Sequence, residues 1–158
     1  MRVRILVING PNLNLLGRRQ PHLYGSMSLA QIEERLQERA SQLQVELKCF
    51  QSNHEGAIVD AIQKEGADVD GIIINPGALT HYSYAVRDAL EAVGKPVVEV
   101  HISNIHAREP FRRHSVIAEV VLGQISGLGW RGYLLALEGL VEMIREERGH
   151  ERAPSPPA

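Results

Sequence analysis

The chain has little cysteine, few aromatic residues and no strong charge of either sign. Cys49 is the only cysteine in 158 residues, so no intramolecular disulfide can form, which fits a reducing compartment. A net charge of -2 supplies no basic field for nucleic acid and no strong attraction to an anionic membrane. Neither a signal peptide nor an apolar run near the roughly 18 residues of a membrane span is visible. We therefore expect a cytoplasmic protein with no nucleic-acid and no membrane partner.

Short apolar runs alternate with amphipathic segments along the chain. Three of the runs are nearly continuous in Val and Ile, a pattern typical of parallel strands that are covered on both faces. The predicted strands are 4–9, 45–51, 71–75, 96–101 and 118–122. The alternation predicts an α/β fold, a flavodoxin-like three-layer sandwich around a five-stranded parallel sheet of order 2-1-3-4-5.

Apolar stripes at helical spacing predict the helices between these strands. Ser28 with Gln31 forms a capping box, which starts the first long helix. The first stripe is Leu29, Ile32, Leu36, Ala40 and Leu43; the second is Ala57, Ile58, Ala61 and Ile62; the third is Tyr82, Ala85, Val86, Ala89, Leu90 and Val93. A last helix is predicted over about 130–148. We expect residues 1–148 to form one domain and 149–158, rich in Pro and small or charged residues, to be a disordered tail.

The connection after the first strand, residues 9–25, is long for an α/β fold, where about 2–6 residues are usual. It carries Arg18, Arg19 and Tyr24 between glycines. A loop that joins cations to a phenol through glycine hinges is typical of an active-site lid. A surface loop with a buried Tyr remains the alternative.

Polar residues also follow the third and fourth strands, and in such folds ligands bind at the carboxyl ends of strands. Asn75 presents an amide there, although a simple turn with Thr80 capping the next helix explains the same residues. Glu99 and His101, two positions apart, share a strand face, and a carboxylate that fixes an imidazole tautomer builds a general acid or base.

A cationic run comes next, with Arg108, Arg112, Arg113 and His114 close together. Guanidiniums at this edge suit a substrate carboxylate, and a solvated helix face is the bland alternative.

Two other patterns imitate functional motifs. Residues 127–132 spell G-x-G-x-x-G, but no strand follows to complete a dinucleotide-binding βαβ unit. The histidines form no zinc-ligand spacing, so no metal is expected. Cys49 lies within an apolar strand and is interpreted as a packed core thiol.

Several motifs in order over residues 3–145 resemble those of type II 3-dehydroquinate dehydratases. They are the runs at 8–17, 24–25, 51–56, 75–78, 80–81, 87–90, 99–104 and 108–109, with Arg19. Gln20 departs from the family, which commonly has Glu after the lid arginine, so a carboxylate contact in the lid would be lost here.

The resemblance implies a hydro-lyase of the shikimate pathway of aromatic amino-acid biosynthesis. Such an enzyme dehydrates 3-dehydroquinate to 3-dehydroshikimate by anti elimination through an enolate, without metal, Schiff base or cofactor. The sequence leaves open a role in quinate breakdown, since the chemistry is shared. The family assembles as a homododecamer, a tetramer of trimers.

The resemblance also implies residue roles. Tyr24 is expected to remove the proton α to the ketone, with Arg19 stabilising the transition state and Arg18 adding to the field. Asn12 is expected to hold the water that meets the enolate oxygen, and His101, held by Glu99, to protonate the leaving hydroxyl. The expected substrate-binding residues are Asn75, His81, Ile102, Ser103 and Arg112, with Asp88 supplied by a neighbouring subunit.

A rival class remains open from the residues alone. A flavodoxin-like binding module could hold a small anion or nucleotide without turnover, and it would need no titrating Tyr.

Overall fold

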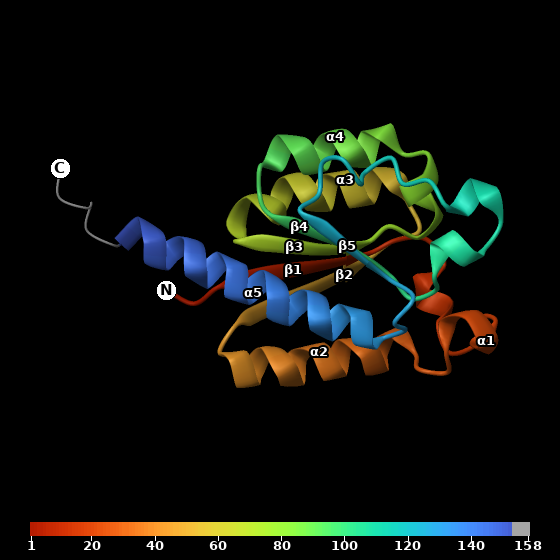
Figure 1. Ribbon diagram of the computed structural model, residues 1–158, viewed down its shortest axis with the longest axis horizontal. Coiled ribbons are helices and arrows are strands. Elements are labelled where there is room, and N and C mark those ends of the chain that lie inside the picture. Colours follow the sequence, from red (N-terminus) through yellow and green to blue (C-terminus); the bar gives the residue numbers. More distant parts are fainter. Residues whose placement is uncertain (153–158) are drawn as a thin grey trace.

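A five-stranded parallel sheet forms the centre of the molecule in the computed structural model, which describes residues 1–152 (Figure 1). Its strands are β1 (Arg4–Asn9), β2 (Glu46–Gln51), β3 (Gly71–Asn75), β4 (Val97–His101) and β5 (Gly123–Ser126). The strand order is β2-β1-β3-β4-β5 and every pairing is parallel. The predicted flavodoxin-like order is confirmed.

Helices cover both faces of this sheet. Helices α2 (Leu29–Leu43) and α5 (Arg131–Arg152) lie on one face, and α3 (Glu55–Lys64) and α4 (Tyr84–Val93) lie on the other (Figure 1). Because successive strand residues point to opposite faces, β1 contributes Ile5 and Val7 to one apolar layer and Leu6 and Ile8 to the other. This double coverage explains why β1, β3 and β4 are almost wholly buried and rich in Ile and Val.

Most of the sequence features that predicted helices have the expected role in the structure. The Ser28 hydroxyl accepts from the Gln31 N–H and the Gln31 side chain accepts from the Ser28 N–H, which completes the predicted capping box. Ile32, Leu36 and Ala40 of the first stripe are buried, as are Ile58, Ala61 and Ile62 of the second. Helix α4 ends at Val93, and the next residue, Gly94, has a positive φ of 67°, which suits a residue without a side chain.

The fifth strand was predicted in the wrong place. Residues 118–122 form turns and bends, and β5 follows at Gly123–Ser126. The apolar run mistaken for a strand packs Val120 and Val121 against the buried core beside α3 and α4. The true strand lies at the sheet edge with one neighbour, so it does not need a continuous apolar sequence.

Three smaller expectations also differ from the structure. Tyr82 precedes α4 and is 61% exposed, so it is not part of the apolar stripe. Thr80 does not cap α4, because Ser83 accepts the Val86 N–H instead. Residues 149–152 continue α5 rather than starting a tail, and residues 153–158 lie outside the described part.

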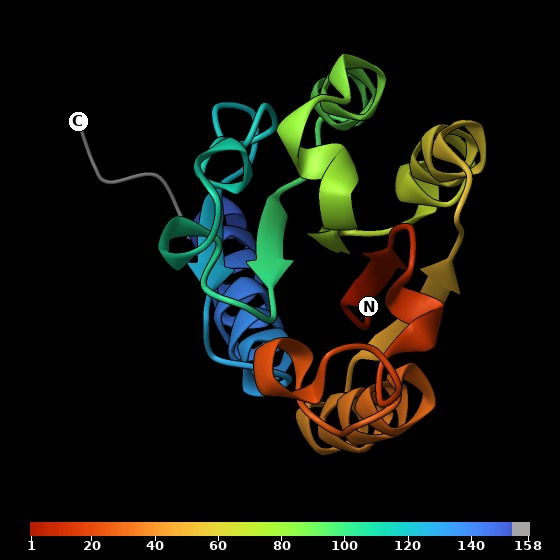
Figure 2. The same cartoon turned by 90° about the vertical axis from the view of Figure 1, so that its right-hand side faces the viewer.

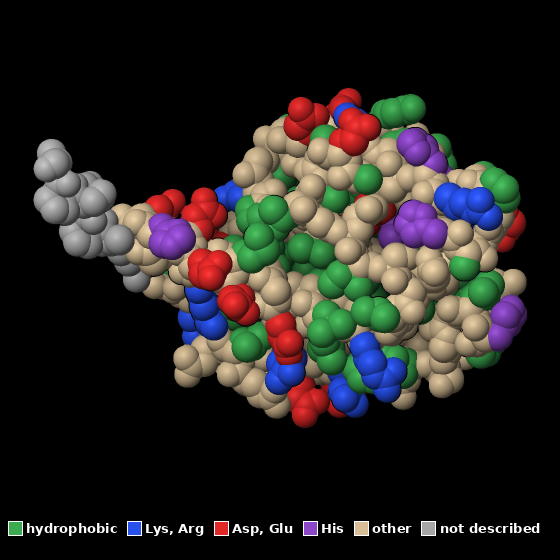
Figure 3. All heavy atoms as spheres, viewed as in Figure 1, with side chains coloured by type: hydrophobic (Ala, Val, Ile, Leu, Met, Phe, Trp, Pro, Cys, Tyr) green, Lys and Arg blue, Asp and Glu red, His purple; other side chains and the backbone are tan. Residues whose placement is uncertain are grey.

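The loops that follow the strands gather at one end of the molecule, which faces the viewer in Figure 2. They include the short helix α1 (Pro21–Tyr24) and the 3-10 turns η1 (Leu13–Leu15), η3 (Gly77–His81), η4 (Ile105–Ala107) and η5 (Pro110–Arg112). Figure 3 shows histidine and cationic side chains at this same end. Within residues 1–152, no helix combines the length and apolarity that crossing a membrane requires.

Candidate active site

A small polar cleft lies at the carboxyl ends of β1, β3 and β4, where parallel folds place their ligands. It is lined by Leu13, Arg19, Tyr24, Asn75, Gly77, Ala78, His81, His101, Ile102, Ser103, Ile105, Arg108 and Arg112. The cleft therefore brings together eight predicted site residues: Tyr24, Arg19, His101, Asn75, His81, Ile102, Ser103 and Arg112.

Two glycines let the loops after β1 and β3 cross at the floor of this cleft. A side chain at Gly10 would meet the Pro76 carbonyl oxygen at 2.3 Å. Gly77 has a φ of 60°, and a side chain there would come within 3.0 Å of the Pro11 carbonyl oxygen. Both positions require glycine because backbone approaches backbone.

Glu99 and His101 form the predicted pair on β4. His101 Nε2 lies 2.5 Å from Glu99 Oε2, and Glu99 is fully buried. Burial alone would raise the pKa of Glu99, but hydrogen bonds from His101, Thr80 and Gln124 lower the pKa below its ordinary value. An ionised Glu99 makes Nε2 the proton-bearing nitrogen, so Nδ1 is left for a ligand.

Thr80 belongs to this pair, although its sequence position had suggested only a helix cap. Its hydroxyl donates to Glu99 Oε2 at 2.7 Å and is buried. Thr80 follows the Asn75 turn by five residues, a spacing that gave no signal of contact with the next strand.

Tyr24 lies between two guanidiniums. Arg108 donates to the Tyr24 hydroxyl oxygen at 2.8 Å, and Arg19 stacks 4.4 Å from the centre of the ring. Tyr24 is only 9% exposed, so these charges act with little screening by water. Two positive charges therefore lie against this one side chain. Arg108 belongs to the cationic run of the sequence, where nothing indicated that it contacts Tyr24.

Both polar atoms of the Asn75 side-chain amide are hydrogen-bonded. Its oxygen accepts the Gly77 N–H at 3.1 Å, and its nitrogen donates to the Tyr133 hydroxyl at 2.9 Å. Tyr133 in turn donates to Asn9 Oδ1 at 2.6 Å. Burial raises the pKa of Tyr133 above its ordinary range, so the hydroxyl keeps the proton that it donates. Tyr133 was missed because its spacing in the last helix matches an ordinary core residue.

His81 presents one defined ring nitrogen to the cleft. Its Nδ1 lies 2.8 Å from the His114 carbonyl oxygen, which can only accept, so Nδ1 carries the proton. Burial, with smaller effects from His101 and Arg112, lowers the pKa of His81, and the ring is neutral at pH 7. Nε2 is therefore an acceptor suited to a substrate hydroxyl.

Arg112 completes the cationic side of the cleft. Its Nε donates to Glu109 Oε2 at 2.8 Å, and the guanidinium still lines the cavity. Arg113 and His114 of the same run are exposed and do not line it.

Besides the fully buried Glu99, two predicted residues do not line the cleft of this one chain. Asn12 is exposed, and its backbone N–H donates to Asn53 Oδ1 at 2.9 Å. Asp88 is exposed on α4. Gln20, the departure in the lid, is also exposed and adopts a left-handed backbone with φ of 33°.

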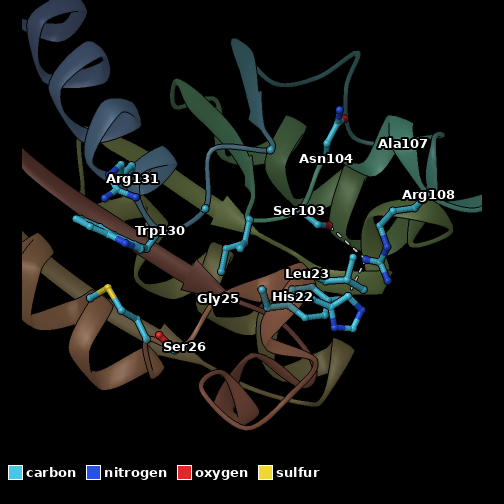
Figure 4. Close-up of a pocket in the computed structure, with 15 residues that line it drawn as sticks. His22, Leu23, Gly25, Ser26, Ser103, Asn104, Ala107, Arg108, Trp130 and Arg131 are labelled. Carbon is cyan, nitrogen blue, oxygen red and sulfur yellow. Dashed lines mark hydrogen bonds between the residues drawn. The ribbon is translucent and has the colours of Figure 1, made fainter.

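A wider groove of about 520 Å³ adjoins the cleft and shares Tyr24, Ile102, Ser103 and Arg108 with it. Figure 4 shows Arg108 beside Ser103, with the lid residues His22 and Leu23 next to them and Trp130 across the groove. The glycine motif at 127–132 forms part of this wall, as the turn between β5 and α5. Within residues 1–152, no three His, Cys, Asp or Glu side chains are arranged to hold a metal ion.

These features define a class of protein. A flavodoxin-like α/β sheet carries a His–carboxylate pair, a phenol between guanidiniums and further cations at one edge, which equips it to move protons on a small anionic substrate.

Comparison with known proteins gives the family. The family model described as "Dehydroquinase class II" matches residues 3–141. A 3-dehydroquinate dehydratase of Roseiflexus castenholzii is 63% identical over 88% of this chain and 88% of its own length. One of Anoxybacillus flavithermus is 60% identical over 90% of this chain and 96% of its own length. The crystal structure of a type II dehydroquinase from Butyrivibrio crossotus, 49% identical, superposes with a TM-score of 0.86 over 88% of this chain and 97% of that one. The chain belongs to the class II dehydroquinase family.

Proposed function

We propose that this protein dehydrates 3-dehydroquinate to 3-dehydroshikimate by anti elimination through an enolate, as a hydro-lyase of the shikimate pathway. The proposal rests on one observation: two side chains that can transfer protons line the same cleft. Tyr24, with its oxygen bonded to Arg108, and His101, with Nε2 bonded to Glu99, both line it. A base and an acid that act on the same small molecule are what an elimination needs.

In the proposed reaction, Tyr24 as phenolate removes the proton from the carbon next to the substrate ketone. The electron pair of that C–H bond forms the enolate, whose oxygen meets a water held by Asn12. His101 is protonated at Nδ1 and gives its Nδ1 proton to the departing hydroxyl. The C–O bond breaks as water leaves. Protons return to His101 and leave Tyr24 through solvent, so the net change is the loss of one water.

Charge and hydrogen bonding in the cleft support roles for the remaining residues. Arg19 stabilises the transition state above the Tyr24 ring, and Arg18 adds to the field. Asn75, His81, Ile102, Ser103 and Arg112 bind the substrate, with the neutral His81 Nε2 accepting from a hydroxyl. No cofactor is needed for these steps.

Assembly completes the proposal. Asp88 points away from its own core on α4 and is proposed to reach the cleft of a neighbouring subunit. The protein is proposed to form a homododecamer of four trimers in the cytoplasm, with residues 1–148 as its catalytic domain.

A spectroscopic assay tests the reaction directly. Mixing the purified protein with 3-dehydroquinate should give rising absorbance from the conjugated enone of dehydroshikimate. A flat trace together with measurable binding of dehydroquinate would overturn the proposed catalysis and favour the binding module. His101→Asn is a suitable blank because it keeps a polar side chain but lacks the acid.

A further inference from the structure

The Glu99 carboxylate is ionised inside the protein without an arginine or lysine partner among residues 1–152. A buried charge is costly unless neighbouring groups donate hydrogen bonds to it. Glu99 meets this requirement through side chains from four different segments of the chain. Two of these segments contribute Ser115 and Gln124, which do not line the cleft.

The two carboxylate oxygens have different partners. Oε2 accepts from His101 Nε2 at 2.5 Å and from Thr80 at 2.7 Å, so it faces the reacting side. Oε1 accepts from Gln124 Nε2 at 2.8 Å and from the Ser115 hydroxyl at 2.9 Å. Ser115 also reaches Oε2 at 3.0 Å and so spans both oxygens.

Gln124 is placed for this contact by strand pairing. In the parallel β4–β5 ladder Glu99 lies opposite Gln124, and opposite residues of neighbouring strands project to the same face. Gln124 is exposed overall, as an edge-strand residue usually is, yet its amide nitrogen reaches inward to a fully buried oxygen. An ordinary solvated Gln would not be aimed at a buried carboxylate.

We infer that Gln124 and Ser115 are positioning residues of the proposed acid. By holding Oε1 they fix the rotation of the carboxylate, which keeps Oε2 aimed at His101 Nε2. A fixed acceptor at Nε2 keeps the proton on that nitrogen and leaves Nδ1 directed to the cleft. The edge strand β5 thus takes part in orienting the imidazole, although it contributes no residue to the cleft itself.

The expected effect on turnover rests on the proposed function. The expected effect on the Glu99–His101 hydrogen bond does not. Gln124→Met keeps the length of the side chain and removes its donor. Because losing an outer partner of a functional His commonly costs about 10–100-fold in metal sites, we expect kcat to fall about 10-fold with KM within about twofold. Ser115→Ala should act in the same direction. Gln63→Met, on the exposed face of α3, is the matched control and should leave both constants unchanged.

Two further measurements separate positioning from a general loss of stability. In a Glu99→Gln background, Gln124→Met should have little further effect on kcat, because the carboxylate through which Gln124 orients His101 has been removed. In the substrate-free protein, the low-field proton signal of His101 Nε2–H, assigned by its loss in His101→Asn, should move in Gln124→Met. This shift is measured even if the wild type does not turn over dehydroquinate, so failure of the inference is distinct from failure of the proposed function.

Any one of three results would overturn the inference. The first is an unmoved proton signal, and the second is an unchanged kcat in the Gln124→Met, Ser115→Ala double variant. The third is an undiminished effect of Gln124→Met in the Glu99→Gln background.

Discussion

Tyr24 differs from an ordinary buried aromatic by what surrounds its oxygen. Arg108 donates to that oxygen and Arg19 covers the ring. We predict that Tyr24→Phe keeps the fold and substrate binding but loses about 10²–10⁴-fold or more in kcat, the usual contribution of a general base. The enone assay and substrate binding by calorimetry measure the two effects separately. Tyr84→Phe, at an exposed tyrosine, is the control. Wild-type turnover in Tyr24→Phe would remove this residue from the mechanism.

Cys49 offers a residue-scale prediction outside the cleft. Burial, with a smaller effect of Glu33, raises the pKa of its thiol to about 12, so the reactive thiolate is scarce at pH 8. We expect a disulfide reagent to react slowly with native protein and to titrate one thiol quickly in guanidinium. Because the folded pKa is raised, the contribution to stability is complete below pH 9.0, the ordinary value, and is lost as pH rises toward about 12. Cys49→Ala should lack this component of the alkaline decline, and fast native labelling at pH 8 would contradict the burial argument.

At the scale of single residues, the sequence predicted contacts within a segment better than contacts between segments. Glu99 and His101 were recognised because strand geometry alone places residues two apart on one face. Arg108 against Tyr24, 84 positions away in the chain, has no such rule. The same holds for Tyr133, whose helical spacing reports burial but not the amide that its hydroxyl meets.

Three elements meet at the Tyr133 hydroxyl. It joins α5 to Asn9 at the end of β1 and to Asn75 at the end of β3, all within the buried interior. Tyr133→Phe leaves a buried acceptor on Asn9 and a donor on Asn75 without this partner. We predict a loss of about 1–3 kcal/mol in the free energy of unfolding, the typical cost of an unsatisfied buried group, measured by urea denaturation. KM should also rise, because the side-chain nitrogen of Asn75 loses its hydrogen bond to the Tyr133 hydroxyl.

Tyr82→Phe provides the comparison for this element-scale effect. Tyr82 is 61% exposed, so removing its hydroxyl should change the free energy of unfolding by little. If Tyr133→Phe proved as stable as wild type with an unchanged KM, the hydrogen-bonded link between α5 and the two strands would have no energetic role.

The elements themselves were largely predictable, with one instructive exception. Periodicity identified β1, β3, β4 and the four long helices because both faces of the sheet are covered and the apolar pattern is forced, whereas the short helix α1 lies in a segment that was predicted as a loop. The apolar run at 118–122 was taken for the last strand, whereas the edge strand β5 reads Gly-Gln-Ile-Ser. Apolar composition reports burial, and here the buried segment is a turn region that packs beside the sheet. The edge strand is only half enclosed and therefore carries the weaker signal.

At the scale of the whole molecule, three large aromatic side chains in segments next to the cleft residues His81 and Arg112 are exposed. Tyr82, Tyr84 and Phe111 are each more than 60% exposed, and Phe111 packs edge-on against His81 at 6.4 Å between ring centres. Aromatic residues exposed together are typical of protein–protein interfaces. Asp88 lies on the same helix as Tyr84. The contacts of an assembly lie between chains, so the sequence of one chain signals them only through exposed side chains such as these.

Asp88 connects assembly to activity in the last prediction. Its side chain is exposed and lies outside the cleft of its own chain. If a neighbour's cleft receives it, the carboxylate becomes buried against cations, and removing one partner of a buried pair commonly costs about 3–5 kcal/mol. Asp88→Ala should therefore raise KM or lower kcat and shift the particle toward smaller oligomers in sedimentation. Asp60→Ala, an exposed carboxylate on α3, should change neither. The wild type decides the matter independently of the variants, because full activity in a sedimenting monomer at assay concentration would exclude a site shared between subunits.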